Sequence, residues 1–304
     1  MPSEKNLKMM DVKRRFLPES EWLFYNIFCN SIMSDEILIS FYNFVYRESQ
    51  LFYCVDKWFY LRYNSPSYHI RFRFHLKDGV VSQNFKEVLY NFILLLEAKN
   101  LTWKVQIDTY DREIERYGGK SIILAESLFH IDSNAIIRIL NQRIFSNDID
   151  LKVLVGLKSI FNLLEDFKLD HEECIKLTSN YLSNKIIFRN IETTRALKNR
   201  YKYFLLIKEK ASQLLKSNYL QIENKLITFP SLSLRSHENK FPIQLVIGEL
   251  KSSQLMEFIL DIIHMSINRL YSIYSEKYEI LLLYLLNKYY SSVYYSNKYN
   301  NKNK

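Results

Sequence analysis

The sequence lacks a long hydrophobic run. Of its 304 residues 48% are hydrophobic, yet no segment approaches the roughly 18 to 20 uncharged apolar residues that a transmembrane helix needs. The first residues, Met1 to Lys5, contain no apolar segment, so we expect no signal peptide. These absences predict a cytoplasmic protein without a membrane span.

Cysteine is scarce, and histidine forms none of the usual metal-binding patterns. The three cysteines, Cys29, Cys54 and Cys174, are odd in number and far apart, which is typical of reduced thiols. The six histidines show no HxxxH or HExxH spacing, which argues against a zinc enzyme. GxGxxG, P-loop and GxSxG motifs are also missing, so the residues indicate neither nucleotide-dependent nor serine-hydrolase chemistry, and they imply no cofactor.

The net charge of +9 favours an acidic partner, either a nucleic acid or an acidic peptide. Lysine is spread along the chain, and no basic run forms a nucleic-acid signature. The charge alone therefore does not decide between these partners.

The first third of the chain alternates strand and helix patterns. Helices are expected from Ser34 and over 82–98, and strands over 22–29, 58–63, 68–75 and 101–108. Ser34 is expected to cap its helix, because acidic residues follow it in the first turn. The order predicts an α+β fold built on a ferredoxin-like split βαββαβ sheet, with helices on one face.

The third expected strand alternates strictly between apolar and cationic residues. One face carries Ile70, Phe72 and Phe74, and must belong to the core. The other face carries His69, Arg71, Arg73 and His75. This second face either contacts solvent or lines a cavity for an anion.

A charged block follows the fourth expected strand. Two arginines and three carboxylates fall between Asp111 and Arg116, and Gly118 and Gly119 come directly after them. Paired glycines permit a sharp backbone turn and the close approach of a ligand. A solvated strand end and a binding site both remain open for this block.

The rest of the chain is predicted to be mostly helical and packed on the sheet. Helices are expected over 133–143, 151–168, 171–184, 191–217, 252–274 and 275–286. Residues 219–234 form a loop or a hairpin, and 241–248 a short buried piece. We expect one domain, with a sheet part over 21–119, a helical part over 120–290 and a disordered tail over 291–304.

His264 lies in the helix expected over 252–274, where Asn268 is one turn further on and shares its face. A lone histidine in a helix is most often structural, so from the residues alone a structural and a catalytic role both stay open.

Five separated blocks carry a family resemblance. They are Trp22 with Tyr25, Trp58 to Tyr63, His69 to Phe74, Tyr110 to Gly119 with Ala125, Glu126, Phe129, Asp132 and Ser133, and His264 to Arg269. In this order they resemble the C-terminal domain of lantibiotic dehydratases, also called the thiopeptide-type bacteriocin biosynthesis domain. In full-length dehydratases that domain follows a large glutamylation domain, so the chain looks like a stand-alone member.

The resemblance implies that the protein eliminates glutamate from glutamylated serine or threonine, leaving dehydroalanine or dehydrobutyrine. His264 matches the family's base, and Arg71 and Arg116 match its glutamate-binding arginines, whose planar forks suit carboxylates. Glu113 matches an acidic residue that orients an arginine or handles a proton. Further substrate-binding residues are expected at His69, Arg73, Tyr117, Asn268 and Arg269. Because Arg73 shares a strand face with Arg71, either can occupy the glutamate site.

The resemblance also implies partners. These are a precursor peptide, with a leader and a core rich in serine, threonine and cysteine, and a separate glutamyl-tRNA-dependent subunit that glutamylates it. The oligomeric state stays open, with a homodimer as one option.

Two other functions remain open. A thiopeptide pyridine synthase joins two dehydroalanines by a formal [4+2] cycloaddition and releases the leader, but it has no glutamate to hold. A non-catalytic leader-peptide or tRNA-binding partner of a glutamylating subunit would suit the positive charge, but it needs no base. If elimination is the function, Arg71, Glu113, Arg116 and His264 should converge on one cavity.

Overall fold

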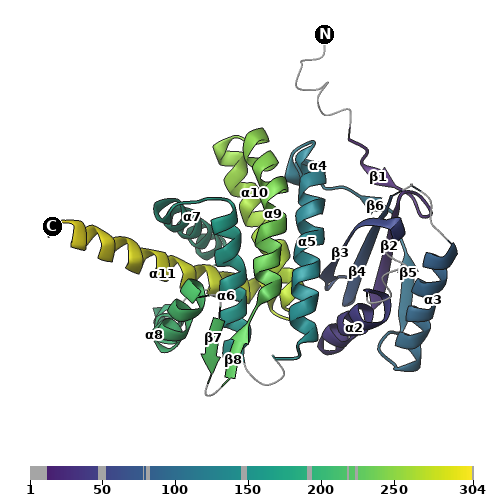
Figure 1. Cartoon of the computed structure of the whole chain (residues 1–304), viewed down its shortest axis with the longest axis horizontal. Coiled ribbons are helices and arrows are strands. Elements are labelled where there is room, and N and C mark those ends of the chain that lie inside the picture. The colour runs from purple at the N-terminus through teal and green to yellow at the C-terminus, as the bar shows by residue number, and fades with distance from the viewer. Residues whose placement is uncertain are drawn as a thin grey trace, which may run out of the picture. The chain divides into compact units, whose positions relative to one another are not determined.

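A computed structural model describes residues 12–302, apart from 47–52, 78, 80–82, 145–148, 190–193, 218 and 223–224. The fold is α+β, with an antiparallel four-stranded sheet followed by a largely helical region (Figure 1). The chain forms two compact units, Met1–Arg143 with Glu238–Ile273 and Ile144–His237 with Tyr274–Lys304. The expectation of a single domain stays a prediction.

The sheet of the first unit has the element order β-α-β-β-α-β that the sequence predicts. Its strands are β2 (Trp22–Phe28), β3 (Val55–Tyr63), β4 (His69–Leu76) and β5 (Lys104–Ile107). Helix α2 (Ser34–Phe41) follows β2, and α3 (Gln83–Ala98) follows β4. The strands lie in the order β3-β4-β2-β5, and every neighbouring pair is antiparallel.

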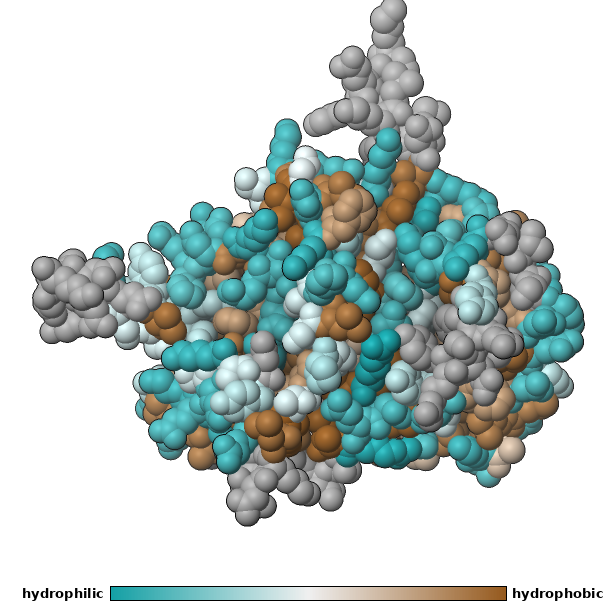
Figure 2. All heavy atoms as spheres, in the orientation of Figure 1, coloured by the Kyte–Doolittle hydropathy of each residue, from teal (hydrophilic) through white to brown (hydrophobic). Residues whose placement is uncertain are grey.

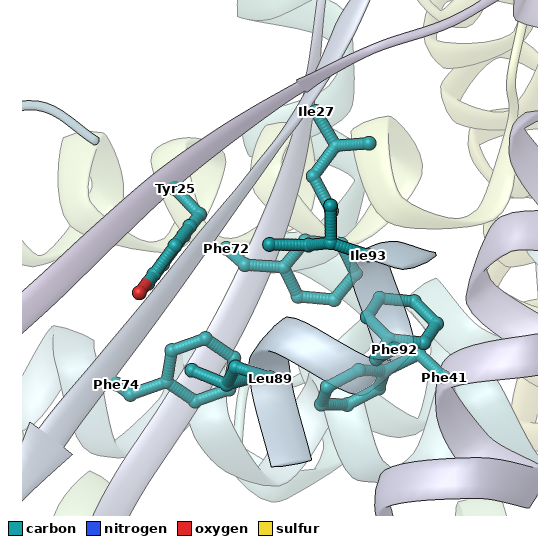
Figure 3. A pocket seen from close by; sticks show the side chains of 8 residues that line it. All are labelled: Tyr25, Ile27, Phe41, Phe72, Phe74, Leu89, Phe92 and Ile93. Carbon is teal, nitrogen blue, oxygen red and sulfur yellow. The ribbon is translucent and has the colours of Figure 1, made fainter. Parts of the chain in front are cut away.

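Helices α2 and α3 cover the apolar face of the sheet, as predicted. Phe41 of α2 lies 4.8 Å from Phe72, and Phe85 of α3 lies 5.4 Å from Phe74, measured between ring centroids. Figure 3 shows apolar side chains from the sheet and both helices around a small cavity at this interface. Burial of each such ring stabilises the fold by about 1.5–3 kcal/mol.

The opposite face of the sheet carries the arginines and is covered by later elements. A short strand β1 (Arg15–Phe16) pairs with β6 (Tyr110–Asp111), and α4 (Ile114–Tyr117) follows. Gly118 and Gly119 then have φ angles of 76° and 48°, which confirms the predicted turn. Helix α5 (Ser121–Asn141) begins at that turn, well before the helix expected over 133–143.

Strand β3 lies at the edge of the sheet, and side chains of α5 and of α10 (Ser252–Leu270) form hydrogen bonds with its backbone. The backbone N–H groups of Trp58 and Tyr60 donate to His130 Nδ1 and Ser133 Oγ, at 3.1 and 3.4 Å. Asn268 pairs with both backbone groups of Arg62, accepting from its N–H and donating to its C=O, each at 2.8 Å. The two helices thereby supply the hydrogen bonds that a further strand would otherwise make.

Arg269, the next residue of α10, also contacts the backbone of β3, and its side chain is buried. Its Nε donates to the Tyr60 carbonyl at 3.1 Å, and its Nη1 lies 3.1 Å from the carboxylate of Asp132. Ser266 Oγ donates to the same carboxylate at 3.0 Å. The Arg269 and Asp132 side chains are only 1% and 5% exposed, so the ion pair is buried and hydrogen-bonded, as a buried charge requires.

Ser34 does not cap α2, contrary to prediction. The helix begins at Ser34, which follows Met33, and the Ser34 hydroxyl accepts a hydrogen bond from Arg62 Nη1 at 2.5 Å. Arg62 Nη2 also lies 2.6 Å from Asp35. The serine is therefore used to satisfy a buried arginine.

The second unit is helical apart from one hairpin. Its helices are α6 (Ile149–Asp166), α7 (His171–Arg189), α8 (Thr194–Ser217) and α11 (Ser275–Lys302). Strands β7 (Tyr219–Ile222) and β8 (Lys225–Thr228) form the hairpin that was one option for 219–234.

Two expectations for the C-terminal third are wrong. Residues 241–248 are not a short buried piece but lie in α9 (Pro230–Glu249), where Phe241 is 71% exposed and Pro242 is accommodated inside the helix. The tail expected to be disordered from Ser291 is helical as far as Lys302. Tyr290, the residue before the expected tail, is fully buried and stacks on Phe161, with 5.8 Å between the ring centroids.

Hydrophilic side chains dominate the surface seen in Figure 2, and hydrophobic ones occur in separate places. Within the described ranges, no helix has the length and apolar composition needed to cross a bilayer.

The two hydrogen bonds between Asn268 and the backbone of Arg62 lead to a prediction about stability. In Asn268→Asp the carboxylate still accepts from the Arg62 N–H, but it cannot donate to the Arg62 C=O. We expect the free energy of unfolding in urea to fall by about 1–3 kcal/mol.

Asn30→Asp is the matched control. The Asn30 side chain only accepts, from the Ile32 N–H at 3.0 Å, so aspartate can replace it. An equal decrease in the free energy of unfolding of the two variants would contradict a stabilising role for the Asn268 hydrogen bonds.

Candidate active site

The charged block over 110–116 has two parts: Tyr110 and Arg112 contact the buried Glu126, and Arg116 contacts α10. In the first part, Arg112 donates to both carboxylate oxygens of Glu126, each at 2.7 Å, and the Tyr110 hydroxyl donates to Glu126 at 2.7 Å. The Glu126 side chain is 1% exposed. These contacts anchor β6 to α5, so this part of the motif has a structural role.

Arg116 links the other part of the block to α10. Its Nη2 lies 2.6 Å from Asp261 Oδ1, and its Nη1 lies 3.2 Å from Glu113 Oε2. Burial alone would lower the pKa of Arg116, but the hydrogen bond that Arg116 donates to Asp261 and the nearby negative charges raise that pKa. The guanidinium therefore stays charged and holds α4 against α10.

Asp261, His264, Met265 and Asn268 share one face of α10, because residues three and four apart are neighbours on a helix. Asp261 contacts α4, and Asn268 contacts β3. His264 is half-buried between these two attachments. Its side chain therefore lies on the face that α10 turns toward the sheet.

A cavity opens where β4, β6, α4, α5 and α10 meet. It encloses about 290 Å³, counting its opening to solvent. Its wall includes Arg73, Tyr110, Glu113, Tyr117, Phe129 and Met265. The cavity joins the arginine strand, the charged block and the residue that follows His264.

Two polar groups on this wall lack a hydrogen-bond partner among the described residues. They are Arg73 Nε and the Tyr117 hydroxyl, and both atoms are buried. The Arg73 guanidinium carbon lies 4.6 Å from the Phe24 ring centroid and 4.5 Å from that of Tyr110, so aromatic rings hold it in place. Each unsatisfied buried group costs about 1–3 kcal/mol, which a ligand with acceptor atoms would offset.

Arg71 lies on the same sheet face but is not among the residues that line the cavity. Its guanidinium carbon is 3.4 Å from the Tyr63 ring centroid, and its Nε donates to His69 Nε2 at 3.1 Å. Because Nε2 accepts, His69 donates from Nδ1 to the Ser67 carbonyl, at 2.7 Å. Leu61, the cross-strand partner of Arg71, does line the cavity, so Arg71 lies next to it.

The expected site is only partly assembled at the cavity. Of the four residues expected to converge, Glu113 lines the cavity, whereas Arg71, Arg116 and His264 are not among its lining residues. Arg116 bridges Glu113 to α10, and Arg73 is the arginine of β4 on the wall. Asn268 and Arg269 bind the backbone of β3, and their expected contact with substrate stays a prediction.

Asp261 was missed by the sequence analysis. It lies three residues before His264, and only the shared helix face could have indicated it.

His69 provides a prediction about pH. Burial, and to a lesser extent the charge of Arg71, lower the pKa of His69, while its bond to Ser67 and the charge of Asp108 act in the other direction. The unfolded chain, with a histidine pKa of about 6.5, therefore binds this proton more readily than the folded protein. The free energy of unfolding should fall as the pH drops below about 6.5.

The matched variant is His69→Gln, whose carbonyl still accepts from Arg71 but cannot titrate. Urea unfolding at pH 7 and pH 5 should show a smaller loss of stability on acidification than in the unmodified protein. Part of the loss should remain, because burial also lowers the pKa of His130. An unchanged loss would show that His69 is not a source of the pH dependence.

Comparison with known proteins identifies the family. Residues 22–290 match the family described as the C-terminal domain of lantibiotic biosynthesis dehydratases. The chain is 32% identical over 175 residues to the subtilin biosynthesis protein SpaB of Bacillus subtilis, covering 56% of this chain and 16% of that protein. It is 28% identical over 186 residues to the nisin biosynthesis protein NisB of Lactococcus lactis subsp. lactis, covering 60% of this chain and 16% of that protein. The match thus spans about a sixth of each of these relatives.

Solved structures share the fold. The tRNA-dependent lantibiotic dehydratase MibB from Microbispora sp. 107891 superposes with a TM-score of 0.64 at 17% identity, over 88% of this chain and 28% of that one. The pyridine synthase TbtD from thiomuracin biosynthesis gives 0.60 at 12% identity, over 90% and 99%. TsrL gives 0.59 at 15% identity, over 90% and 95%. Because the family match covers most of its length, the chain belongs to the family of lantibiotic biosynthesis dehydratase C-terminal domains.

Proposed function

We propose that this protein eliminates glutamate from glutamylated serine and threonine residues of a precursor peptide, leaving dehydroalanine and dehydrobutyrine. A glutamyl-tRNA-dependent partner would supply the glutamylated peptide. The observation that carries the proposal is the cavity at which the arginine strand, the charged block and α10 meet.

The reaction needs a base and a site for a carboxylate. The base removes the α-proton of the esterified residue, and the bond between Cβ and the ester oxygen breaks. Glutamate then leaves as a carboxylate that includes this oxygen. A positioned base contributes about 10²- to 10⁴-fold to such a rate. His264 is the proposed base, because it shares the sheet-facing side of α10 with Met265 of the cavity wall.

Arg73 is the arginine best suited to hold glutamate. Among the described residues its guanidinium has no carboxylate partner, and its Nε is buried without a hydrogen bond. A planar guanidinium binds a carboxylate through two parallel hydrogen bonds. Arg71, beside the cavity, is the proposed second cation.

Arg116 already contacts carboxylates of the protein, whereas Arg73 pairs with none among the described residues. Both of its Nη atoms already contact carboxylates, those of Asp261 and Glu113. It can hold glutamate only by exchanging one of these for the substrate. We therefore assign Glu113 the role of orienting Arg116, and Arg116 the role of connecting α4 to the base helix.

A pyridine synthase is the second candidate, because the chain covers nearly the whole of TbtD. That reaction joins two dehydroalanines and has no glutamate to bind. Within the described part of the chain, no carboxylate pairs with Arg73, and such an arginine favours elimination over this alternative.

The masses of the products separate the two functions. A glutamylated peptide incubated with the protein should lose one glutamate for each modified residue. A peptide that already carries two dehydroalanines should stay unchanged. A product with a cyclised core and a released leader would instead support the pyridine synthase and contradict elimination.

The catalytic roles are tested with the same glutamylated peptide. His264→Ala should slow elimination by roughly 10²- to 10⁴-fold while peptide binding persists, so the glutamylated peptide accumulates. Arg73→Lys and Arg71→Lys should also be slow, because an ammonium keeps the charge but loses the planar fork.

The control for the arginines is Arg15→Lys, in an exposed pair with Asp111. It should turn over normally. If the arginines only attract the peptide by charge, the Lys variants should match the unmodified protein, and any loss should disappear at low ionic strength. That outcome would remove Arg71 and Arg73 from the carboxylate site.

A further inference from the structure

The hydroxyl of Tyr117 is buried without a partner on the wall of the cavity. The residue is 3% exposed, and no hydrogen bond to its hydroxyl forms within the described part of the chain. Its ring packs edge-to-face on Phe129 of α5 and Phe258 of α10, with centroid distances of 5.5 and 6.0 Å. The ring is therefore held from two sides, and its hydroxyl has a defined position.

The hydroxyl is also fixed as a neutral donor. Burial raises the pKa of Tyr117 well above its ordinary value, and the carboxylates of Asp261 and Glu113 act in the same direction, against the opposing charge of Arg116. A phenol with such a pKa keeps its proton at neutral pH. It can therefore donate a hydrogen bond to an acceptor that enters the cavity.

Tyr110 shows that the missing partner at Tyr117 is not a general feature of this wall. Both tyrosines line the same cavity and both are buried, at 4% and 3% exposure. The Tyr110 hydroxyl donates to Glu126 at 2.7 Å, which accounts for its burial. The Tyr117 hydroxyl donates to no residue that the structure describes, although leaving a buried hydroxyl unpaired costs stability.

We infer that the Tyr117 hydroxyl donates a hydrogen bond to the backbone carbonyl oxygen of the residue undergoing elimination, and stabilises the enolate that forms there. This inference rests on the proposed function. A carboxylate is better served by the charged donors of Arg73, whereas a neutral donor suits an oxygen whose charge develops only during the reaction. Contact with Phe258 places Tyr117 against α10, the helix that carries the proposed base.

The step balances with no additional reactant. The base takes the α-proton, and the electrons of the C–H bond move to the carbonyl oxygen. They return to form the Cα–Cβ double bond as the ester oxygen leaves with glutamate. Tyr117 keeps its proton throughout, and the base later releases its own proton to water.

The test compares Tyr117→Phe with Tyr110→Phe in the full chain. Each variant loses only a hydroxyl from the same cavity. For Tyr117→Phe, kcat for loss of glutamate from the glutamylated peptide should fall by about 10²- to 10³-fold, with KM nearly unchanged. Its urea midpoint should not fall, because no hydrogen bond is lost. The midpoint of Tyr110→Phe should fall, because the bond to Glu126 is lost.

The outcomes distinguish this inference from the function on which it rests. If the unmodified protein does not release glutamate, the proposed function fails, and the inference fails with it. If the unmodified protein is active and Tyr117→Phe has the same kcat, only the inference is overturned. A rise in KM at constant kcat would assign the hydroxyl to ground-state binding and also overturn it. A lowered midpoint for Tyr117→Phe would mean that the hydroxyl has a structural partner, with the same consequence.

Discussion

The free edge of β3 determines how the first unit is assembled. Peptide groups at a sheet edge need partners, and here side chains of α5 and α10 provide them. Asn268 pairs with the backbone of Arg62 as a neighbouring strand would, and Arg269 reaches the carbonyl of Tyr60. These contacts fix both the position and the rotation of α10. His264 lies on the same face of α10, between Asp261 and Asn268.

The cavity lies between two ion pairs, and polar atoms on its wall have no hydrogen-bond partner among the described residues. The Arg112–Glu126 pair anchors the charged block to α5, and the Arg116–Asp261 pair ties it to α10. Between these two anchors, Arg73 Nε and the Tyr117 hydroxyl are buried and have no hydrogen-bond partner among the described residues. Natural proteins accept such a loss of stability mainly at functional sites, where a ligand restores the missing bonds. The Arg112–Glu126 and Arg116–Asp261 pairs position Arg73 and Tyr117 before a ligand binds, which is the condition for a preorganised site.

Local patterns were sufficient to predict the sheet and its two faces. The alternation over 68–75 depends only on the two-residue period of a strand, and the order β-α-β-β-α-β follows from successive local patterns. Which of Arg71 and Arg73 lines the cavity was not predictable, because it depends on which part of the sheet faces the residues of β6 and α4. The roles of Asn268 and Arg269 were missed for the same reason, since their partners in β3 lie about 200 residues away. In α9, burial of Ile243 and Val246 overrode the local signal of Pro242. In α11, the polar C-terminal composition predicted disorder, but the chain is helical as far as Lys302.

The proposed elimination requires that the cavity hold glutamate close to α10, the helix that carries the proposed base. The most direct measurement is a crystal structure with a peptide in which glutamate is attached through an amide, so that it cannot be eliminated. The account predicts that the glutamyl carboxylate binds the guanidinium of Arg73, that the α-carbon of the modified residue faces His264, and that its carbonyl oxygen lies within hydrogen-bonding distance of the Tyr117 hydroxyl. A glutamyl group bound elsewhere on the protein, with this cavity unchanged, would contradict it.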